Sequence, residues 1–540
     1  MAIQKFIEDH KRVIVCAFFG VYFLLGVWIA KDYGISWDEP FQRNTGYVTY
    51  NYLVEGDSTL LNYRDRCYGV AAEVPLIFLE KLLRLKDARY IYLARHYATF
   101  FLFYLCVFFF YLLCKYHFKS WKIGLLGSLF LILTPRVFAH SFYNTKDLTF
   151  LSMFVIAGYY MIKSMNEKTL LCAGISALTS ALLIDMRIVG ILVPGITLCV
   201  LLIEFIKERR NKRELLKVVA RGGLYVVALA FFTVLFWPFL WEAPVINFIE
   251  AIKRMSRYVA WDGTMLYMSE YVRATQLPWH YAPVWISITT PIMYLFCFFA
   301  GVITLLITAL RNPVRFAYEK QKEIAYLMWF FAPLLMAILL KSVLYDAWRH
   351  LYFIYPGMLM IALIGLVSIF KTAKRAPKAI YYALSLIMII VMSVNVYDVV
   401  AFMVKNHPHQ DVYFNKFAGR NMKEVKNNYE LDYWGVSYRE ALEYILANDK
   451  RDTIKILAAN DPCNYNAMIL PPEERKRLVF VKDPQQADYF LTNYRWHKDE
   501  YPETDLESVY SIKVGNAKIM GIYKIRKQVL QPTAGPHEQQ

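Results

Sequence analysis

Long apolar segments recur along most of this chain, and they constrain its fold more than any other feature of the sequence. A helix needs about 20 mostly apolar residues to cross the hydrocarbon core of a bilayer. The sequence is 57% hydrophobic, whereas a soluble globular protein contains about 45–50% apolar residues. We therefore predict a polytopic α-helical membrane protein with about 11 transmembrane helices. The predicted spans are residues 13–30, 91–113, 123–137, 148–161, 170–184, 188–205, 222–237, 284–310, 324–340, 351–370 and 379–404.

The distribution of charge predicts how the chain is oriented in the membrane. Its formal net charge is +17, which by itself is also typical of nucleic-acid-binding proteins. The basic residues, however, cluster in short stretches between apolar segments, at 207–217, 311–322 and 371–378. Short cytoplasmic loops of membrane proteins carry such an excess of Lys and Arg. The pattern argues against a nucleic-acid partner, predicts an inner N-terminus and an outer C-terminus, and is compatible with contacts to anionic membrane lipids.

Two long loops are predicted on the outer side, at residues 31–89 and 238–283. Each contains an apolar stretch with basic residues at helical spacing, at 75–85 and 245–259. We expect both stretches to form helices that lie in the membrane interface. An ordinary packed pair of helices would give the second stretch the same pattern.

The composition changes at residue 405, after which short β-type runs alternate with charged and turn residues. The chain is therefore predicted to contain a transmembrane domain at 1–404, a small extracytoplasmic α/β domain at 405–530 and a disordered polar tail at 531–540. In the α/β domain we predict a helix at 437–446 and strands at 453–458, 478–481, 489–492, 509–514 and 519–525.

Two adjacent carboxylates, Asp38 and Glu39, follow the first predicted span directly. Carboxylates are costly beside a bilayer and usually mark a functional site there. One interpretation is structural: Ser36 and Glu39 match a helix capping box, and Pro40 suits the first helical turn. The other is catalytic, with Asp38 as a general base near the membrane face. Both hold at once if Glu39 caps the helix while Asp38 faces the site.

A second polar cluster lies between the third and fourth predicted spans. Lys146 could bind a phosphate as a point charge, with Asp147 orienting it. Alternatively, Asp147 caps the fourth span and Lys146 reaches the membrane interface. Further along, Asp185 and Arg187 bracket a short turn and are typical of a structural ion pair. The full cluster consists of Arg136, His140, Asn144, Lys146 and Asp147.

A third charged pair, Arg349 and His350, follows the ninth predicted span. An arginine beside a histidine outside the membrane suits an anion, because the guanidinium group can bind phosphate in a bidentate manner. No spacing of His, Cys or Asp in the sequence matches a zinc site. If the site used a divalent cation, Asp38 and Asp147 would be its ligands.

These groups, taken in order, resemble those of a known superfamily. An acidic pair after the first span, a mixed cluster between the third and fourth, interfacial helices in the outer loops and a late outer arginine are similar to the GT-C membrane glycosyltransferases. The resemblance is strongest to glycosyltransferase family 39, which contains protein O-mannosyltransferases and lipid A aminoarabinose transferases. It covers residues 1–404. The sequence lacks the lectin-like module of eukaryotic mannosyltransferases and the WWD-type motif of oligosaccharyltransferases.

The resemblance implies an inverting glycosyltransferase with a GT-C fold. Such an enzyme moves a sugar from a polyprenyl-phosphate donor to a hydroxyl of a lipid, glycan or protein at the outer membrane face. It implies no required cofactor, with a divalent cation as the open alternative. The compact loops and the lack of a retrieval signal favour the bacterial inner membrane, with the site and the C-terminal domain on the periplasmic side. The implied residues are Asp38 and Glu39 for catalysis, and Arg136, Lys146, Asp147, Arg349 and His350 for the phosphate and sugar of the donor.

A transporter or flippase of lipid-linked sugars is the alternative from another functional class. It would use the same basic groove without chemistry. Transporters often contain internal repeats and broken helices near the membrane midplane. The sequence has no internal repeat, and its charged clusters are predicted at one membrane face, so the enzyme is the favoured interpretation.

Overall fold

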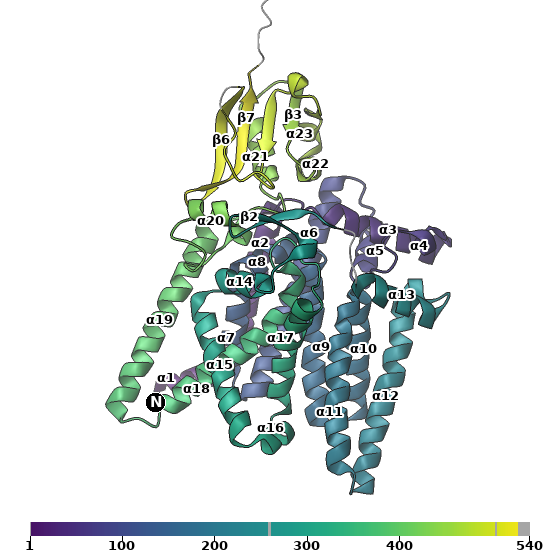
Figure 1. The fold of residues 1–540 in the computed structure, drawn as a ribbon, viewed down its shortest axis with the longest axis vertical. Coiled ribbons are helices and arrows are strands. Elements are labelled where there is room, and N and C mark those ends of the chain that lie inside the picture. Colours follow the sequence, from purple (N-terminus) through teal and green to yellow (C-terminus); the bar gives the residue numbers. More distant parts are fainter. Residues whose placement is uncertain (1, 257–260, 503–504, 527–540) are drawn as a thin grey trace, which may run out of the picture.

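The computed structural model of the chain describes residues 2–256, 261–502 and 505–526. A bundle of long helices forms most of the molecule, and a small β-sheet domain stands at one end of it (Figure 1). The N-terminus and the basic turns between long helices, including α16 (Pro313–Glu319), lie at the opposite end. The basic stretches therefore share one end of the bundle, as the charge pattern predicted.

Within the described residues, nine helices are long and apolar enough to cross a membrane, or ten if one bent pair counts as a single span. The bent pair consists of α7 (Trp121–Ile132) and α8 (Pro135–Tyr143), which meet at 72°. The shorter apolar helix α10 (Leu170–Met186) accounts for the remaining predicted span. The nine long helices are α2 (Lys11–Ile29), α6 (Ala88–Phe118), α9 (Asp147–Glu167), α11 (Leu192–Glu208), α12 (Lys212–Phe236), α15 (Ile292–Arg311), α17 (Gln321–Leu339), α18 (Tyr355–Ala373) and α19 (Lys378–Lys405).

Prolines explain where two predicted spans are interrupted. The residue before a proline is disfavoured in the helical conformation. Thr134, before Pro135, has an extended backbone with φ −107° and ψ 96°, and the third predicted span breaks there. Thr290, before Pro291, is also extended, with φ −95° and ψ 139°. The eighth predicted span is therefore not one helix but two, α14 (Tyr281–Thr289) and α15.

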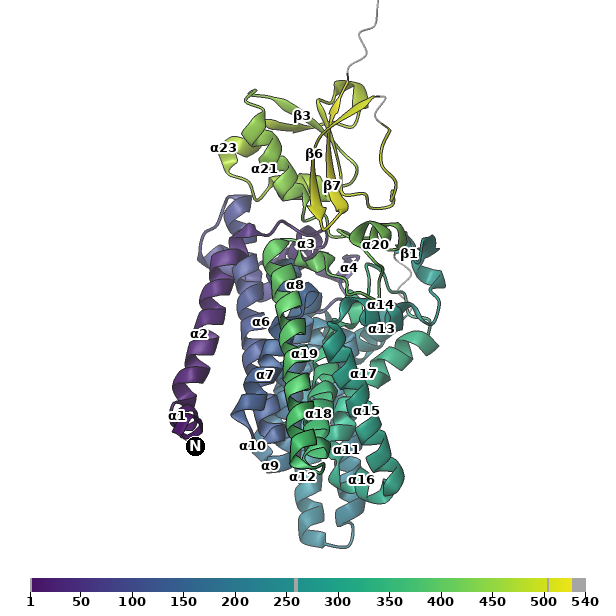
Figure 2. The same cartoon turned by 90° about the vertical axis from the view of Figure 1, so that its left-hand side faces the viewer.

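The centre of the bundle is formed by α9 and by α18 with the short 3-10 helix η5 (Arg349–Ile354) before it. The apolar parts of these two spans are each 72% buried, compared with 22% for α2 and 11% for α19. Figure 2 shows α2 along an outer edge of the bundle. α15 packs tightly on α18, since a Cβ on Gly365 would lie only 2.0 Å from the carbonyl oxygen of Cys297. Glycine permits this close approach of two membrane helices.

The long loops lie at the end of the bundle that carries the sheet domain (Figure 1). Both predicted loop helices are present, as α5 (Glu73–Leu82) and α13 (Pro244–Ser256). The last residues of the second prediction, 257–259, lie outside the described residues. The other elements of these loops are α3 (Glu39–Glu55), α4 (Thr59–Asn62) and an antiparallel hairpin of β1 (Thr264–Tyr267) and β2 (Glu270–Arg273).

The C-terminal domain is built on a five-stranded sheet with strand order β4-β3-β5-β7-β6. β3 pairs in parallel with β4 and β5, while β7 pairs antiparallel to β5 and β6. The five predicted strands and the predicted helix are confirmed; the predicted tail at 531–540 lies outside the described residues. The elements are α20 (Met422–Asn428), α21 (Tyr438–Asn448), β3 (Ile454–Ala458), α22 (Pro462–Ala467), α23 (Pro472–Arg475), β4 (Leu478–Phe480), β5 (Tyr489–Thr492), β6 (Leu506–Val514) and β7 (Ala517–Ile525).

Candidate active site

Charged side chains from separate parts of the chain meet where the helical bundle faces the sheet domain. One precedes α3, one opens α9, one follows α10, two flank the start of η5, and one lies in the turn after β5. We call this group the Arg–Asp network. It consists of Asp38, Asp147, Arg187, Asp346, Arg349 and Arg495.

Local structure positions the members at the centre of the network. The side-chain oxygen of Asn144 accepts a hydrogen bond from the backbone N–H of Asp147 at 2.8 Å, which satisfies the first N–H of α9. The Asn144 amide also donates to the Asp147 carboxylate at 3.1 Å. Asp346 and Ala347 adopt left-handed backbone conformations, with φ 56° and 62°. Such residues cost about 1–3 kcal/mol each, so contacts of the surrounding network must hold the turn that leads into Arg349.

Arg349 lies at the centre of the network and binds three carboxylates. Its Nη1 donates to Asp38 Oδ2 at 3.1 Å and to Asp147 Oδ2 at 2.9 Å. Its Nη2 donates to Asp346 Oδ2 at 3.2 Å. The Arg349 side chain is 1% exposed, so a lone guanidinium here would be strongly destabilising, and the carboxylates compensate its charge.

Two further arginines complete the charge balance. Arg187 pairs with Asp147 at 2.5 Å, and Arg495 pairs with Asp346 at 2.7 Å. The network thus holds three arginines and three aspartates. Asp147 and Asp346 each bind two arginines and are 1% and 5% exposed, whereas Asp38 binds the central arginine and is 22% exposed. Asp38 is therefore the carboxylate of the network that a substrate can reach.

Tryptophan rings enclose the guanidinium groups. The Arg349 guanidinium lies 4.6 Å from the ring centre of Trp434. The Arg495 guanidinium lies 5.0 Å from the ring of Trp37 and 4.5 Å from that of Trp496. Desolvated cation–π contacts of this kind contribute up to about 2 kcal/mol. Because Trp434, Arg495 and Trp496 follow residue 405, the C-terminal part of the chain forms a wall of this site.

Glu39 lies beside Asp38 but is fully buried. Its Oε2 accepts hydrogen bonds from the backbone N–H of Ser36 at 2.8 Å and from the Ser36 hydroxyl at 3.2 Å. Its Oε1 lies 3.0 Å from Nε2 of His96. The bond to the Ser36 N–H is the contact that a capping box would make, but α3 begins at Glu39 with Asp38 as its N-cap, so the predicted capping box with Ser36 as N-cap is not formed. Glu39 therefore fixes the start of α3 and, through it, the position of Asp38.

Two other predicted residues lie next to the network. The Lys146 ammonium group lies 4.5 Å above the ring of Tyr68, and its side chain is half-buried. The His350 ring meets the ring of Tyr345 edge-on at 4.4 Å. Its Nδ1 is buried and has no hydrogen-bond partner in the part of the chain that the structure describes.

Arg136 lies apart from the Arg–Asp network. Its Nε donates to the backbone oxygen of Tyr413 at 2.9 Å, and its guanidinium lies 4.5 Å from the ring of Phe414 and 5.5 Å from that of Trp285. Arg136 thus connects α8 to the segment after α19. Among the described residues its two terminal nitrogens have no hydrogen-bond partner.

The ion pair predicted between Asp185 and Arg187 is wrong. Arg187 pairs with Asp147, and Asp185 accepts a hydrogen bond from the backbone N–H of Val70 at 3.2 Å. The backbone of Arg187 is extended, with φ −155° and ψ 133°. The chain therefore leaves the helical path of α10 at this residue, and the side chain reaches the first residue of α9 instead.

A guanidinium nitrogen occupies the space between the two carboxylates that were considered as metal ligands. Nη1 of Arg349 bonds to both Asp38 Oδ2 and Asp147 Oδ2. In residues 2–256, 261–502 and 505–526, no group of three or more His, Cys, Asp or Glu side chains is placed to hold a metal ion. A cation between the two aspartates would have to displace Arg349, so this arrangement does not fit a metal centre.

Comparisons with known proteins find likeness in shape alone. No protein-family model and no curated protein matches the sequence. The solved structures that are similar include apo ArnT from Cupriavidus metallidurans, with 12% identity, a TM-score of 0.48, and 95% of this chain and 98% of that chain covered. The oligosaccharyltransferase AglB from Archaeoglobus fulgidus, solved with an inhibitory peptide and a dolichol-phosphate, has 10% identity, a TM-score of 0.46, and coverage of 90% and 70%. At these scores the likeness assigns no family to the chain.

Proposed function

We propose that this chain is an integral membrane glycosyltransferase that moves a sugar from a polyprenyl-phosphate donor to a hydroxyl acceptor with inversion at the anomeric carbon. Asp38 carries the proposal: it is a partly exposed carboxylate, bonded to a buried arginine, at the end of the bundle where both long loops and the sheet domain meet. Its site would lie on the outer side of the membrane, which is the periplasmic side if the membrane is a bacterial inner membrane, because the basic turns lie at the other end.

In this mechanism Asp38 is the general base. The acceptor hydroxyl oxygen forms a bond to C1 of the sugar, and its proton passes to the Asp38 carboxylate. The bond between C1 and the phosphate oxygen breaks, and its electron pair leaves with the polyprenyl phosphate. Attack opposite the leaving phosphate inverts C1. A positioned general base typically contributes about 10²–10⁴-fold to the rate.

Arg349 positions this base. Its two terminal nitrogens already bond to three carboxylates, so the guanidinium is largely satisfied before a donor binds. Asp147 and Asp346 hold Arg349, and Arg349 in turn fixes one oxygen of Asp38. We therefore assign Arg349 to the orientation of the base rather than to direct binding of the phosphate.

Lys146 is the residue that we assign to the donor phosphate. Its ammonium group lies over an aromatic ring next to Asp147 and is half-buried. A preorganised cation beside the leaving group stabilises the negative charge that develops on the phosphate as the C1–O bond breaks. The unpartnered Nδ1 of His350 is a second group that could bind this phosphate. Arg136, which lies apart from the network, is assigned a structural role.

The test is turnover of purified protein with a series of polyprenyl-phosphate hexoses and a membrane lipid extract as acceptor. Asp38→Asn keeps the shape of the side chain and removes its basicity, so the rate should fall about 10²–10⁴-fold. Asp461→Asn, at the exposed aspartate just before α22, is the matched control and should be unaffected. A normal rate for Asp38→Asn would refute the assignment of the base, and retention of the donor's anomeric configuration would refute the mechanism.

A further inference from the structure

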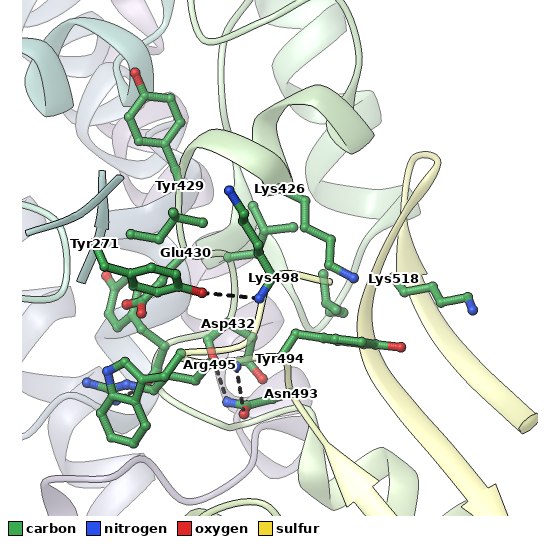
Figure 3. A pocket seen from close by; sticks show the side chains of 15 residues that line it. Tyr271, Lys426, Tyr429, Glu430, Asp432, Asn493, Tyr494, Arg495, Lys498 and Lys518 are labelled. Carbon is green, nitrogen blue, oxygen red and sulfur yellow. Dashed lines mark hydrogen bonds between the residues drawn. The ribbon is translucent and has the colours of Figure 1, made fainter. Parts of the chain in front are cut away.

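A pocket lies between the β1–β2 hairpin and the C-terminal domain (Figure 3). It contains about 340 Å³ of space free of protein atoms, part of it open to solvent. The enclosed cavity within it is small, about 20 Å³, so a ligand would lie across its open side. Tyr271 from the hairpin and Tyr494 and Trp496 from the domain line it with aromatic rings. Such rings offer flat apolar faces with polar edges, which suit a ligand that has both apolar and hydroxyl-bearing surfaces.

A carboxylate with an unused acceptor atom also lines this pocket. Glu430 is 8% exposed, and its Oε1 is buried without a hydrogen-bond partner in the described part of the chain. An unsatisfied buried polar atom costs about as much as a lost hydrogen bond, so it calls for an explanation. Burial raises the pKa of Glu430 to about 7. A ligand hydroxyl that donated to Oε1 would satisfy this atom.

Three lysines, Lys426, Lys498 and Lys518, also line this pocket. Lys426 and Lys518 share one carboxylate, that of Glu500, at 3.4 and 3.0 Å. The Lys498 ammonium group donates to the backbone oxygen of Ser269 at 3.3 Å. Two ammonium groups thus share one carboxylate while that of Lys498 contacts a backbone oxygen, and this excess of positive charge favours an anionic group on the ligand.

The pocket adjoins the Arg–Asp network through shared residues. Arg495 lines the pocket and binds Asp346 of the network. Trp496 also lines the pocket, and its ring lies 6.0 Å from that of Trp37, the residue before Asp38. A ligand bound at the pocket would therefore have one layer of side chains between it and the carboxylate that we assign as the base.

We infer that this pocket binds an anionic saccharide, a sugar that bears a phosphate or carboxylate group, as the part of the acceptor that the enzyme recognises. The sugar ring packs on Trp496 and Tyr271, a hydroxyl donates to Glu430, and the anionic group meets Lys498. The identification of this saccharide as the acceptor rests on the proposed function, whereas the binding site itself does not.

Binding is tested on the full chain in detergent micelles by saturation-transfer NMR. The probe is glucose 6-phosphate, compared directly with glucose and, through competition for the same signal, with inorganic phosphate. We expect saturable binding of glucose 6-phosphate that is about tenfold weaker in Glu430→Gln and in Lys498→Met, since each loses a charge-assisted contact. Lys450→Met, at an exposed lysine of the same domain that does not line the pocket, is the matched control and should bind as wild type does.

The outcomes separate this inference from the proposed function. Absence of glucose 6-phosphate binding, or equal binding by the wild type and both pocket variants, would overturn the site. Equal affinity for glucose would overturn the role of the lysines, and equal affinity for inorganic phosphate would overturn recognition of the sugar. If donor turnover depends on Asp38 while the probe does not bind, the enzyme stands and the pocket assignment fails. If the probe binds but no donor is consumed, the pocket stands and the proposed reaction fails.

Discussion

The contact between Arg495 and Asp346 predicts a measurable coupling between the C-terminal domain and the membrane part of the site. The two groups lie 2.7 Å apart and are 4% and 5% exposed. Removal of one partner of a buried ion pair costs about 3–5 kcal/mol, because the other charge is left uncompensated. Asp346 keeps its bond to Arg349 at 3.2 Å, so for Arg495→Met we expect the lower end of this range, about 3 kcal/mol.

A second substitution isolates the part of this cost that comes from the stranded carboxylate. Asp346→Asn removes that charge, so the variant that carries both changes should be more stable than the sum of the single effects predicts. We expect a coupling of about 0.5–3 kcal/mol, the range measured for residues in one hydrogen-bond or salt-bridge network. Arg495→Met alone should also slow donor turnover. Asp346 would lose its second arginine partner, and the position of Arg349, and therefore of Asp38, would shift.

The assay is unfolding of the four proteins in mixed micelles that contain a rising fraction of denaturing detergent. The exposed pair Lys476 and Glu473, whose side chains are 70% and 83% exposed, provides the control cycle and should show additive effects because surface pairs contribute little. If the changes in unfolding free energy caused by Arg495→Met and Asp346→Asn add to within about 0.5 kcal/mol, the two groups are not coupled. The inference that the C-terminal domain stabilises the site is then refuted.

Three further predictions address the metal, the pH dependence and the helix packing. Chelation with EDTA should leave donor turnover unchanged, because Arg349 lies between the two candidate ligands; loss of activity that Mg²⁺ restores would contradict this. Because burial raises the pKa of Glu430 from 4.5 to about 7, its protonated form stabilises the fold, and this contribution is lost as the pH rises through about 7. The melting temperature should therefore fall more between about pH 5 and 8 in wild type than in Glu430→Gln. The same dependence of melting temperature on pH in both proteins would contradict this role of Glu430. Gly365→Ala would place a methyl group 2.0 Å from a carbonyl oxygen of α15 and should cost about 1–3 kcal/mol. In contrast, a Cβ added at Gly174 would have no other atom within 4 Å, so Gly174→Ala should stabilise α10 by up to about 1 kcal/mol. Equal melting temperatures for the two variants would refute the packing argument.

Much of the fold could be predicted because two patterns of apolar residues dominate the sequence. Runs of apolar residues long enough to span a bilayer correspond to helices throughout the bundle, and alternating short runs after residue 405 correspond to the five strands. The breaks at Pro135 and Pro291 were not predicted, because each proline lies within a long, mostly apolar stretch that hydropathy alone assigns to one span. The β1–β2 hairpin was missed since its strands are only four residues long.

The site was predictable one residue at a time but not as a network. Asp38, Asp147 and Arg349 each stand at the end of an apolar run, and the predicted topology placed all three at one face. Their partners follow from three-dimensional packing. Asp346 is three residues before Arg349, a spacing that could have indicated a contact across one turn, whereas Arg495 lies in a turn of the sheet domain and has no pattern that marks it.

The same network bears on how the protein matures. Asp38 enters the membrane near the start of synthesis, whereas Arg495 is made only after the last long helix and three strands of the sheet. Until then Asp346 has one arginine instead of two, and the wall that contains Trp434 and Trp496 is incomplete. A nascent or truncated chain would therefore hold its helices in the bilayer with the base poorly oriented. Under the proposed function, unfinished copies of the enzyme would therefore not cleave lipid-linked sugars.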